Sequence, residues 1–177
     1  ETVDGGNLGV MGWSQGGTDA LLAAEAHPGT FQAVVTWSGA LELNGASLFA
    51  GTSFEDAYAQ AKKEGFYTMT FDWREPLELG ERWFQEVAET NILKVTADIK
   101  APILAINGKD DTTVTPDNAE KIVKAAANAD SQLLLVDNCD HTYNVFSGDF
   151  TALYQTVDAT AAFFQAQLIP AAAQAAA

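Results

Sequence analysis

The sequence is poor in cysteine, in histidine and in basic residues, and it has no long apolar run. Cys139 is its single cysteine, which excludes a framework of disulfides within the chain. Nine Lys and Arg residues stand against 24 Asp and Glu residues, so the formal net charge is -15. Nucleic acids and anionic membrane surfaces repel such an acidic protein. No window approaches the roughly 18 consecutive apolar residues of a membrane span. We therefore expect neither nucleic acid nor a membrane as a partner.

Strand-like and helix-like segments alternate along most of the chain. Its 177 residues suit one domain, and a hydrophobic content of 47% excludes general disorder. Short apolar runs predict four buried strands, at residues 7–11, 31–37, 102–107 and 132–136. Helical spacing predicts three helices, at residues 16–27, 116–127 and 149–168. This alternation indicates an α/β fold with a mostly parallel sheet covered on both faces. On the last helix we expect an inward stripe of Leu153, Val157, Ala161 and Phe164.

One long segment, residues 41–100, interrupts this alternation and is dense in aromatic side chains. Within it we expect a strand at 66–71 and a helix at 80–89. Long insertions over the carboxyl edge of a sheet commonly form lids or binding elements. We therefore expect a core at 1–40 and 101–169, a lid at 41–100 and a low-complexity, alanine-rich tail at 170–177. The aromatic side chains of such an insertion can line a pocket or form only the insertion's own small core. As substrate-binding residues we predict Trp13, Phe71, Trp73 and Trp83.

The run Gly12-Trp13-Ser14-Gln15-Gly16-Gly17 follows the first predicted strand and precedes a helix. A G-x-S-x-G sequence in that place is the signature of a nucleophile elbow, a turn too tight for side chains on either side of the serine. The turn presents the Ser14 hydroxyl as a nucleophile. It also puts the Gln15 backbone N–H at a helix N-terminus, where a developing oxyanion is stabilised.

A serine hydroxyl needs a base, and the chain has two histidines. His27 ends the predicted helix after the elbow, a position typical of a capping residue. His141 follows the last predicted strand, at the edge of a parallel sheet where ligands bind. A carboxylate to orient the base comes after the third strand, where Asp111 is our first candidate and Asp110 our second. Ser14, Asp111 and His141 thus occur in the order Ser, Asp, His, each just after a strand.

With these motifs the chain resembles the alpha/beta-hydrolase family. The matching stretches are Gly-Trp-Ser-Gln-Gly-Gly at 12–17, Gly-Lys-Asp-Asp-Thr-Thr-Val at 108–114 and Asp-His-Thr-Tyr at 140–143. The family pattern G-x-x-D-x-x-V places its catalytic acid at Asp111. The resemblance implies a serine carboxylesterase in which Ser14 attacks an ester, His141 moves the proton, Asp111 orients the base and Gln15 stabilises the oxyanion. Such a mechanism needs no metal and no cofactor.

Within that family the chain looks most like lid-bearing esterases of the feruloyl (cinnamoyl) type. The stretches that carry this narrower likeness are 77–80, 110–112, 115–116 and 140–141. They imply a small-molecule ester substrate. The more specific prediction is an ester with a hydroxycinnamoyl acyl group. The likeness is looser than the one to the family as a whole, because a lid rich in aromatic residues is common to many binding proteins.

The family places strands and a second oxyanion donor upstream of the elbow, and only residues 1–8 precede it here. A sheet that begins at the elbow strand would leave an apolar edge unpaired. We therefore expect this chain to be the C-terminal part of a longer enzyme, with the N-terminal part or a second chain completing the sheet.

Two other functions are compatible with the same residues. A serine peptidase of the prolyl-oligopeptidase type shares the elbow and the G-x-x-D-x-x-V pattern. A hydrolase-like fragment without turnover could instead bind a partner through its sheet edge. A comparison of peptide amides with aryl esters as substrates distinguishes a peptidase from an esterase. Failure of a serine-directed probe to label Ser14 would favour the fragment without turnover.

Overall fold

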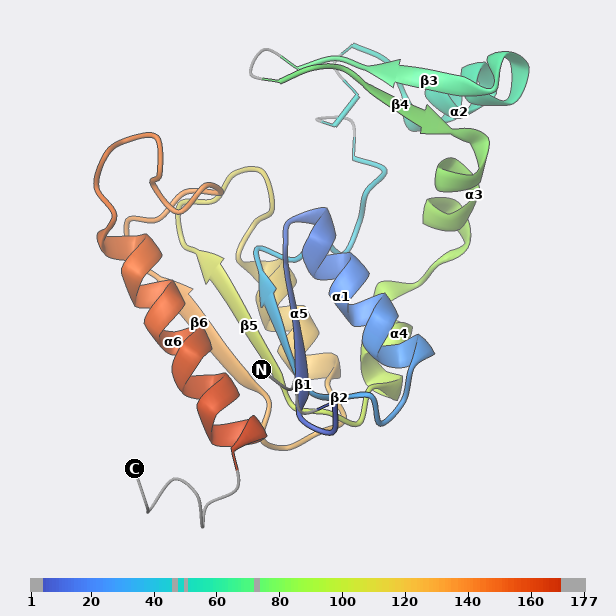
Figure 1. Ribbon diagram of the computed structural model, residues 1–177. Helices are drawn as coiled ribbons and strands as arrows, with labels where there is room; N and C mark the ends of the chain where they lie inside the picture. Colours follow the sequence, from blue (N-terminus) through green and yellow to red (C-terminus); the bar gives the residue numbers. More distant parts are fainter. Residues whose placement is uncertain (1–4, 46–47, 50, 72–73, 170–177) are drawn as a thin grey trace. The chain divides into compact units, whose positions relative to one another are not determined.

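The computed structural model describes residues 5–45, 48–49, 51–71 and 74–169, and it divides into two compact units (Figure 1). The first unit contains the chain up to Leu41 and from Ile92 onward, and the second contains Glu42–Asn91. The predicted insertion, 41–100, is longer than the second unit because it also includes a helix of the first.

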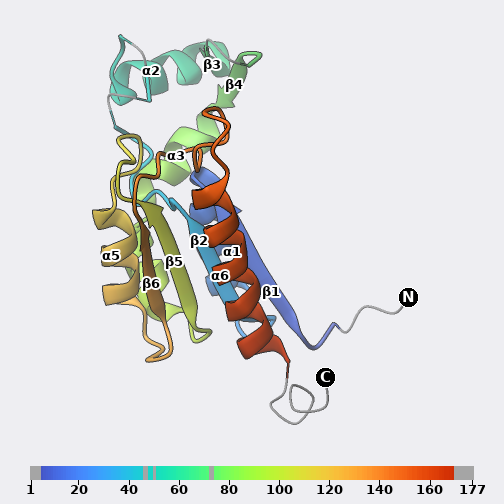
Figure 2. The ribbon, with the colours of Figure 1, turned by 90° about the vertical axis from the view of Figure 1, so that its left-hand side faces the viewer.

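A four-stranded parallel sheet forms the centre of the first unit. Its strands are β1 (Leu8–Trp13), β2 (Phe31–Trp37), β5 (Ile103–Gly108) and β6 (Gln132–Val136), in the order β1-β2-β5-β6. The pairs run in parallel, so the carboxyl ends of the strands lie at one end of the sheet (Figures 1 and 2). The predicted parallel sheet and its four strands are confirmed, with boundaries that differ by at most two residues.

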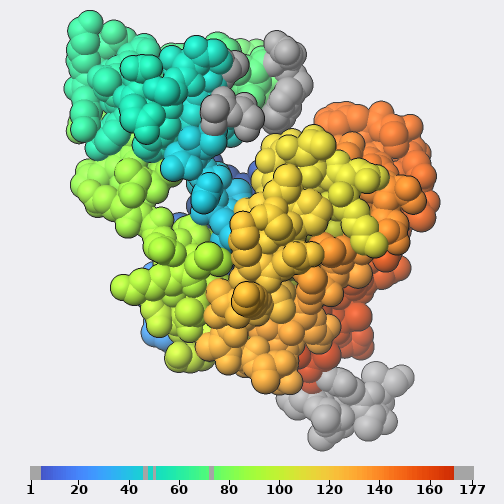
Figure 3. Space-filling view, turned by 180° about the vertical axis from the view of Figure 1, so that it is seen from behind, coloured from blue at the N-terminus to red at the C-terminus, as the bar shows by residue number. Residues whose placement is uncertain are grey.

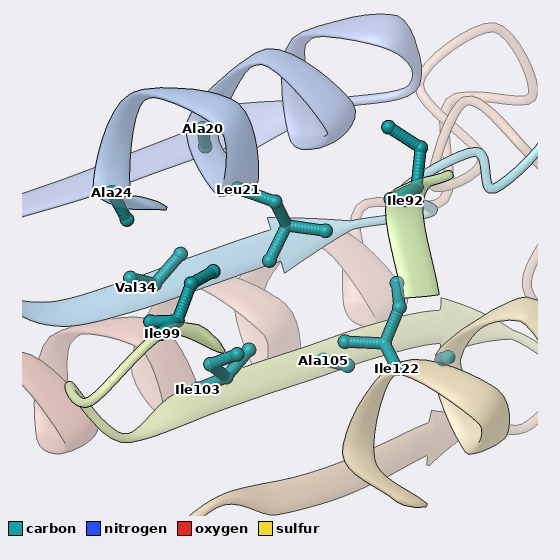
Figure 4. Close-up of a cluster of buried hydrophobic side chains, with 10 residues drawn as sticks. Ala20, Leu21, Ala24, Val34, Ile92, Ile99, Ile103, Ala105 and Ile122 are labelled. Carbon is teal, nitrogen blue, oxygen red and sulfur yellow. The ribbon is translucent and has the colours of Figure 1, made fainter. Parts of the chain in front are cut away.

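Helices cover both faces of this sheet. On one face lie α1 (Gln15–Ala26), α4 (Ile92–Asp98) and α5 (Asp117–Ala125), and on the other lies α6 (Thr151–Leu168). Figure 4 shows the core of the first face, where side chains of the three helices meet those of β2 and β5. Figure 3 shows the first unit from the side on which α5 and the chain around it form the surface. The packing of both faces leaves the loops at the carboxyl end of the sheet free to carry functional groups.

The burial of β1 and of α6 differs from the sequence prediction. Strands β2 and β5 are buried, but β1 alternates between exposed and half-buried positions, because among the described strands it lies at the edge and pairs with β2 alone. The predicted stripe on α6 is wrong for Val157 and Ala161, which are exposed. Leu153 and Phe164 are half-buried and pack against the core. The side chains that face the sheet are Ala152, Thr156, Thr160 and Phe163.

Two threonines explain why the hydrophobic pattern failed on α6. The Thr156 hydroxyl donates to the Ala152 carbonyl at 2.8 Å, and the Thr160 hydroxyl accepts the indole N–H of Trp37 at 2.9 Å. A buried hydroxyl that has a hydrogen-bond partner is tolerated in a core, so polarity alone does not mark these positions as exposed.

The second unit has a small aromatic core of its own. It contains α2 (Phe54–Glu64), the antiparallel pair β3 (Phe66–Met69) and β4 (Leu77–Gly80), and α3 (Glu81–Glu89). Phe49 and Phe84 are fully buried at its centre and contact the rings of Phe54, Tyr67 and Trp83. The predicted strand and helix near 66–71 and 80–89 are present, whereas β4 was not predicted. Within the described part of the chain, no helix is both long and apolar enough to cross a membrane.

Candidate active site

Ser14 lies on the sharp turn between β1 and α1. Its backbone has φ 57° and ψ -124°, a conformation that non-glycine residues rarely adopt and that occurs at functional sites. The turn requires a glycine at position 12, because a Cβ there would stand 1.8 Å from the Gly16 carbonyl oxygen, whereas a Cβ at Gly16 would meet nothing within 4 Å. The Ser14 N–H donates to the Trp37 carbonyl at 2.9 Å, which fixes the turn to the neighbouring strand. The strained turn therefore holds the serine at the carboxyl end of β1.

Gln15 is the first residue of α1. The first N–H groups of an α-helix have no acceptor within the helix, and they carry the positive end of its dipole. The Gln15 N–H follows the nucleophile directly, so it is placed to meet an oxygen that gains charge when Ser14 attacks.

Asp111 lies in the loop after β5 and its side chain is buried. Oδ1 accepts the backbone N–H groups of Thr113 at 2.9 Å and Val114 at 2.8 Å. Asn107, from the end of β5, donates to the Val114 carbonyl at 2.9 Å and thereby closes the loop. The neighbouring Asp110 is exposed, and only its backbone N–H bonds across the loops, to Cys139. The loop thus turns one aspartate inward and the other outward.

The surroundings of Asp111 keep it ionised. Burial raises the pKa of its carboxyl, but the hydrogen bonds from His141 and from the Val114 N–H outweigh burial and leave the pKa below its ordinary value. The Coulombic attraction of His141 and the Ser38 hydroxyl act in the same direction. Asp111 is therefore a carboxylate at neutral pH and can act only as an acceptor.

His141 joins the two other residues. It follows β6, in a loop that Asp140 holds by accepting the backbone N–H groups of Thr142 at 2.8 Å and Asn144 at 3.0 Å. Nδ1 lies 2.8 Å from Asp111 Oδ2, and Nε2 lies 3.0 Å from Ser14 Oγ. Since the carboxylate accepts, Nδ1 carries the proton in the neutral ring, which leaves Nε2 free to accept the serine hydroxyl proton.

The structure thus brings together Ser14, Asp111 and His141, three residues that the sequence placed after three different strands. Trp13 adjoins them: its indole N–H donates to the His141 carbonyl at 2.9 Å. His27 is the C-cap residue of α1, at the opposite end of that helix from Ser14. Phe71 and Trp83 lie in the aromatic core of the second unit, and Trp73 lies outside the described residues.

Sequence reasoning missed the residues that support this site. Ser38 and Tyr143 are buried, both have a positive φ, and their hydroxyl oxygens lie 3.3 Å apart. Burial raises the pKa of the Tyr143 phenol, so it remains a donor. Ser38 follows β2 directly, and Tyr143 comes two residues after His141, so their positions after strand ends were the available signal.

Cys139 and the metal-binding residue types are further candidate functional groups in the described part of the chain. The Cys139 thiol is buried, and burial together with Asp140 raises its pKa to about 11, which disfavours the thiolate. Among the described residues, no group of three or more His, Cys, Asp or Glu side chains is arranged to hold a metal ion.

The fold and the arrangement of the site define a protein of the alpha/beta-hydrolase class. The sequence model of the prolyl oligopeptidase family matches residues 1–169, and the chain belongs to that family. A comparison with curated protein sequences gave no match.

Solved structures of known hydrolases share the fold. Est1E from Butyrivibrio proteoclasticus aligns with a TM-score of 0.67 and 20% identity over 90% of this chain and 61% of its own. The monoacylglycerol lipase of Paleococcus ferrophilus gives 0.65 and 17%, over 92% of this chain and 70% of its own. A puromycin-hydrolyzing peptidase of Mycobacterium tuberculosis gives 0.63 and 22%, over 94% of this chain and 22% of its own. The predicted fold class, the C-terminal part of an alpha/beta-hydrolase fold, is confirmed. This chain spans about three fifths of the length of Est1E.

Proposed function

We propose that the chain carries the catalytic residues of a serine hydrolase that cleaves carboxylic esters. The observation that supports this most directly is the position of His141, whose ring nitrogens lie 3.0 Å from Ser14 Oγ and 2.8 Å from Asp111 Oδ2. Both distances are within hydrogen-bond range, as a nucleophile, its base and an orienting carboxylate require.

The proposed reaction has two steps. Ser14 Oγ forms a bond to the ester carbonyl carbon while its proton passes to His141 Nε2, and the carbonyl electrons move to the oxygen. The Gln15 N–H stabilises that oxyanion, and Asp111 stabilises the imidazolium. When the oxyanion collapses, the bond to the alcohol breaks and the alcohol leaves with the proton of His141. Water then attacks the acyl-enzyme with His141 again as the base, which releases the acid and restores Ser14.

For the substrate we propose an ester with an aromatic acyl group, of which hydroxycinnamoyl (feruloyl-type) esters are the first candidates. One solved structure with this fold is that of Est1E with bound ferulic acid, and it aligns with this chain at a TM-score of 0.68 and 19% identity. Trp13, which lies beside His141, is the side chain of the first unit that we propose for binding such a ring. The predicted binding roles of Phe71, Trp73 and Trp83, and the role of the second unit as a lid, stay predictions.

The prolyl oligopeptidase family supports a second candidate, a serine peptidase. The same residues would then attack an amide, and His141 would protonate the leaving amine. The two candidates share the acylation of Ser14 and differ only in the leaving group.

A fluorophosphonate probe tests the shared part of the proposal, and a substrate panel tests the rest. We expect the probe to label the purified protein and to fail with Ser14→Ala, whose folding is checked by circular dichroism. If Ser14→Ala hydrolysed esters at the wild-type rate, the assignment of the nucleophile would be wrong. Methyl hydroxycinnamates, short-chain nitrophenyl esters and peptide amides, assayed side by side, then separate the two candidates.

We also propose that a further segment of the same protein, or a second chain, pairs with the free edge of β1. Only β2 pairs with β1 among the described strands, and Met11 on β1 is 45% exposed. An apolar strand edge invites pairing, and a partner at this edge could supply a second oxyanion donor. Intact mass and sedimentation velocity of the active sample test this idea, and a fully active monomer with the mass of these 177 residues would contradict it.

A further inference from the structure

Trp13 makes two contacts to His141. Its indole Nε1–H donates to the backbone carbonyl of His141 at 2.9 Å, and its ring centroid lies 5.2 Å from the imidazole centroid, with an angle of 38° between the planes. The two residues are 128 positions apart in the chain. Trp13 is also the residue directly before Ser14, so the indole reaches from the elbow itself to the loop that carries the base.

These contacts fix His141 to the elbow at two points. The ring nitrogen Nε2 meets Ser14 Oγ, and the backbone carbonyl meets the side chain of the preceding residue, Trp13. Because Trp13 and Ser14 share a peptide bond, the backbone of the base cannot move away from the nucleophile without breaking the indole hydrogen bond. The tilted indole also occupies space beside the imidazole, which limits rotation of that ring.

We propose that Trp13 is a positioning residue that holds the His141 loop at the distance required for proton transfer from Ser14. This inference rests on the proposed function and adds to it a role that differs from the predicted substrate contact. A substrate contact acts through the exposed face of the ring, whereas the positioning role acts through the N–H. Proton transfer depends steeply on geometry, so the loss of a positioning contact lowers the rate of the chemical step rather than the affinity for substrate.

The chain offers a matched control in Trp37. It pairs with Trp13 across β1 and β2, and its indole N–H makes a hydrogen bond of the same length, 2.9 Å, but to Thr160 on α6. Substituting either tryptophan by phenylalanine keeps an aromatic ring and removes one indole donor. Only Trp13→Phe removes a donor to the carbonyl of His141.

The experiment compares steady-state kinetics of the purified protein, Trp13→Phe and Trp37→Phe on the best ester of the panel. We expect Trp13→Phe to lower kcat about tenfold, with KM changed by less than about twofold. Trp37→Phe keeps the backbone carbonyl that accepts the Ser14 N–H and keeps an aromatic ring beside Tyr143, so it should lower kcat far less than Trp13→Phe does. A raised KM with unchanged kcat in Trp13→Phe would overturn the positioning role in favour of substrate contact alone.

A second measurement does not depend on turnover. In NMR spectra of the wild type, the His141 Nδ1–H and the Trp13 indole N–H should both exchange slowly with water. The His141 signal should broaden in Trp13→Phe and persist in Trp37→Phe. An unchanged His141 signal in Trp13→Phe, or fast exchange of the wild-type Trp13 indole, would overturn the proposal. If the wild type hydrolyses nothing, the proposed function fails, and these spectra alone decide on the role of Trp13.

Discussion

Asp111 and His141 lie 30 residues apart in the chain, yet Asp111 Oδ2 and His141 Nδ1 are 2.8 Å apart. Neighbouring parallel strands produce this proximity, because β5 leads into the loop of Asp111 and β6 leads into the loop of His141. A second contact ties the loops together: the Asp110 N–H donates to the Cys139 carbonyl at 3.0 Å.

The first prediction separates the two aspartates. Asp111→Asn should lower kcat by about three to four orders of magnitude, because an amide donor at this position favours the wrong imidazole tautomer. Asp110→Asn changes an exposed side chain and should leave kcat within about threefold of wild type. Kinetics of both variants on one ester make the comparison. Equal losses in the two variants would contradict the assignment of Asp111.

A second prediction concerns stability in acid. The folded state lowers the pKa of Asp111, so the unfolded state binds more protons as the pH falls. The contribution of Asp111 to the free energy of unfolding is therefore complete above the ordinary aspartate pKa of about 3.9 and is lost as the pH falls through the lower folded value. Urea unfolding measures the free energy of unfolding of the wild type and of Asp111→Asn at several pH values, and the difference between the two should shrink in acid. A difference that stays constant between about pH 6 and pH 3 would contradict this prediction.

The third prediction tests the steric demand of the elbow. A Cβ added at Gly12 would stand 1.8 Å from the backbone oxygen of Gly16. The backbone cannot relieve this clash by a rotamer change, as a flexible side chain could. Gly12→Ala should therefore lower the free energy of unfolding by about 3 kcal/mol or more. Gly16→Ala is the matched control, since its Cβ would meet nothing within 4 Å. Denaturant unfolding measures both, and similar losses in the two variants would argue against a steric cause.

A fourth prediction concerns the single cysteine. Cys139 is buried and its thiol has a pKa raised to about 11, so the reactive thiolate is scarce at neutral pH. Ellman's reagent should react with the native protein far more slowly than with the protein in guanidinium chloride. Rapid labelling of the native protein would show that the loop before His141 opens readily.

The local pattern of the sequence already contained the elbow, the order of Ser14, Asp111 and His141, and the alternation of strands and helices. Each of these depends on neighbours in the chain: glycines that permit a tight turn, apolar runs that form buried strands, and loops that follow parallel strands. The sequence pattern also favoured Asp111 over Asp110, and the structure turns Asp111 inward. The predicted burial of β1 and of part of α6 was wrong, because burial depends on which other elements pack against a strand or helix and not on its neighbours in the chain.

Tertiary structure alone decided the contacts between distant residues. The hydroxyl groups of Ser38 and Tyr143 contact each other, and the Trp13 indole donates to the His141 carbonyl. Both contacts form because the ends of separate strands converge at one edge of the sheet. No periodicity or motif records such a pairing, as the residues involved are more than a hundred positions apart. The sequence by itself therefore determined which groups can perform the chemistry. The packing of β1, β2, β5 and β6 determined which other side chains hold those groups in place.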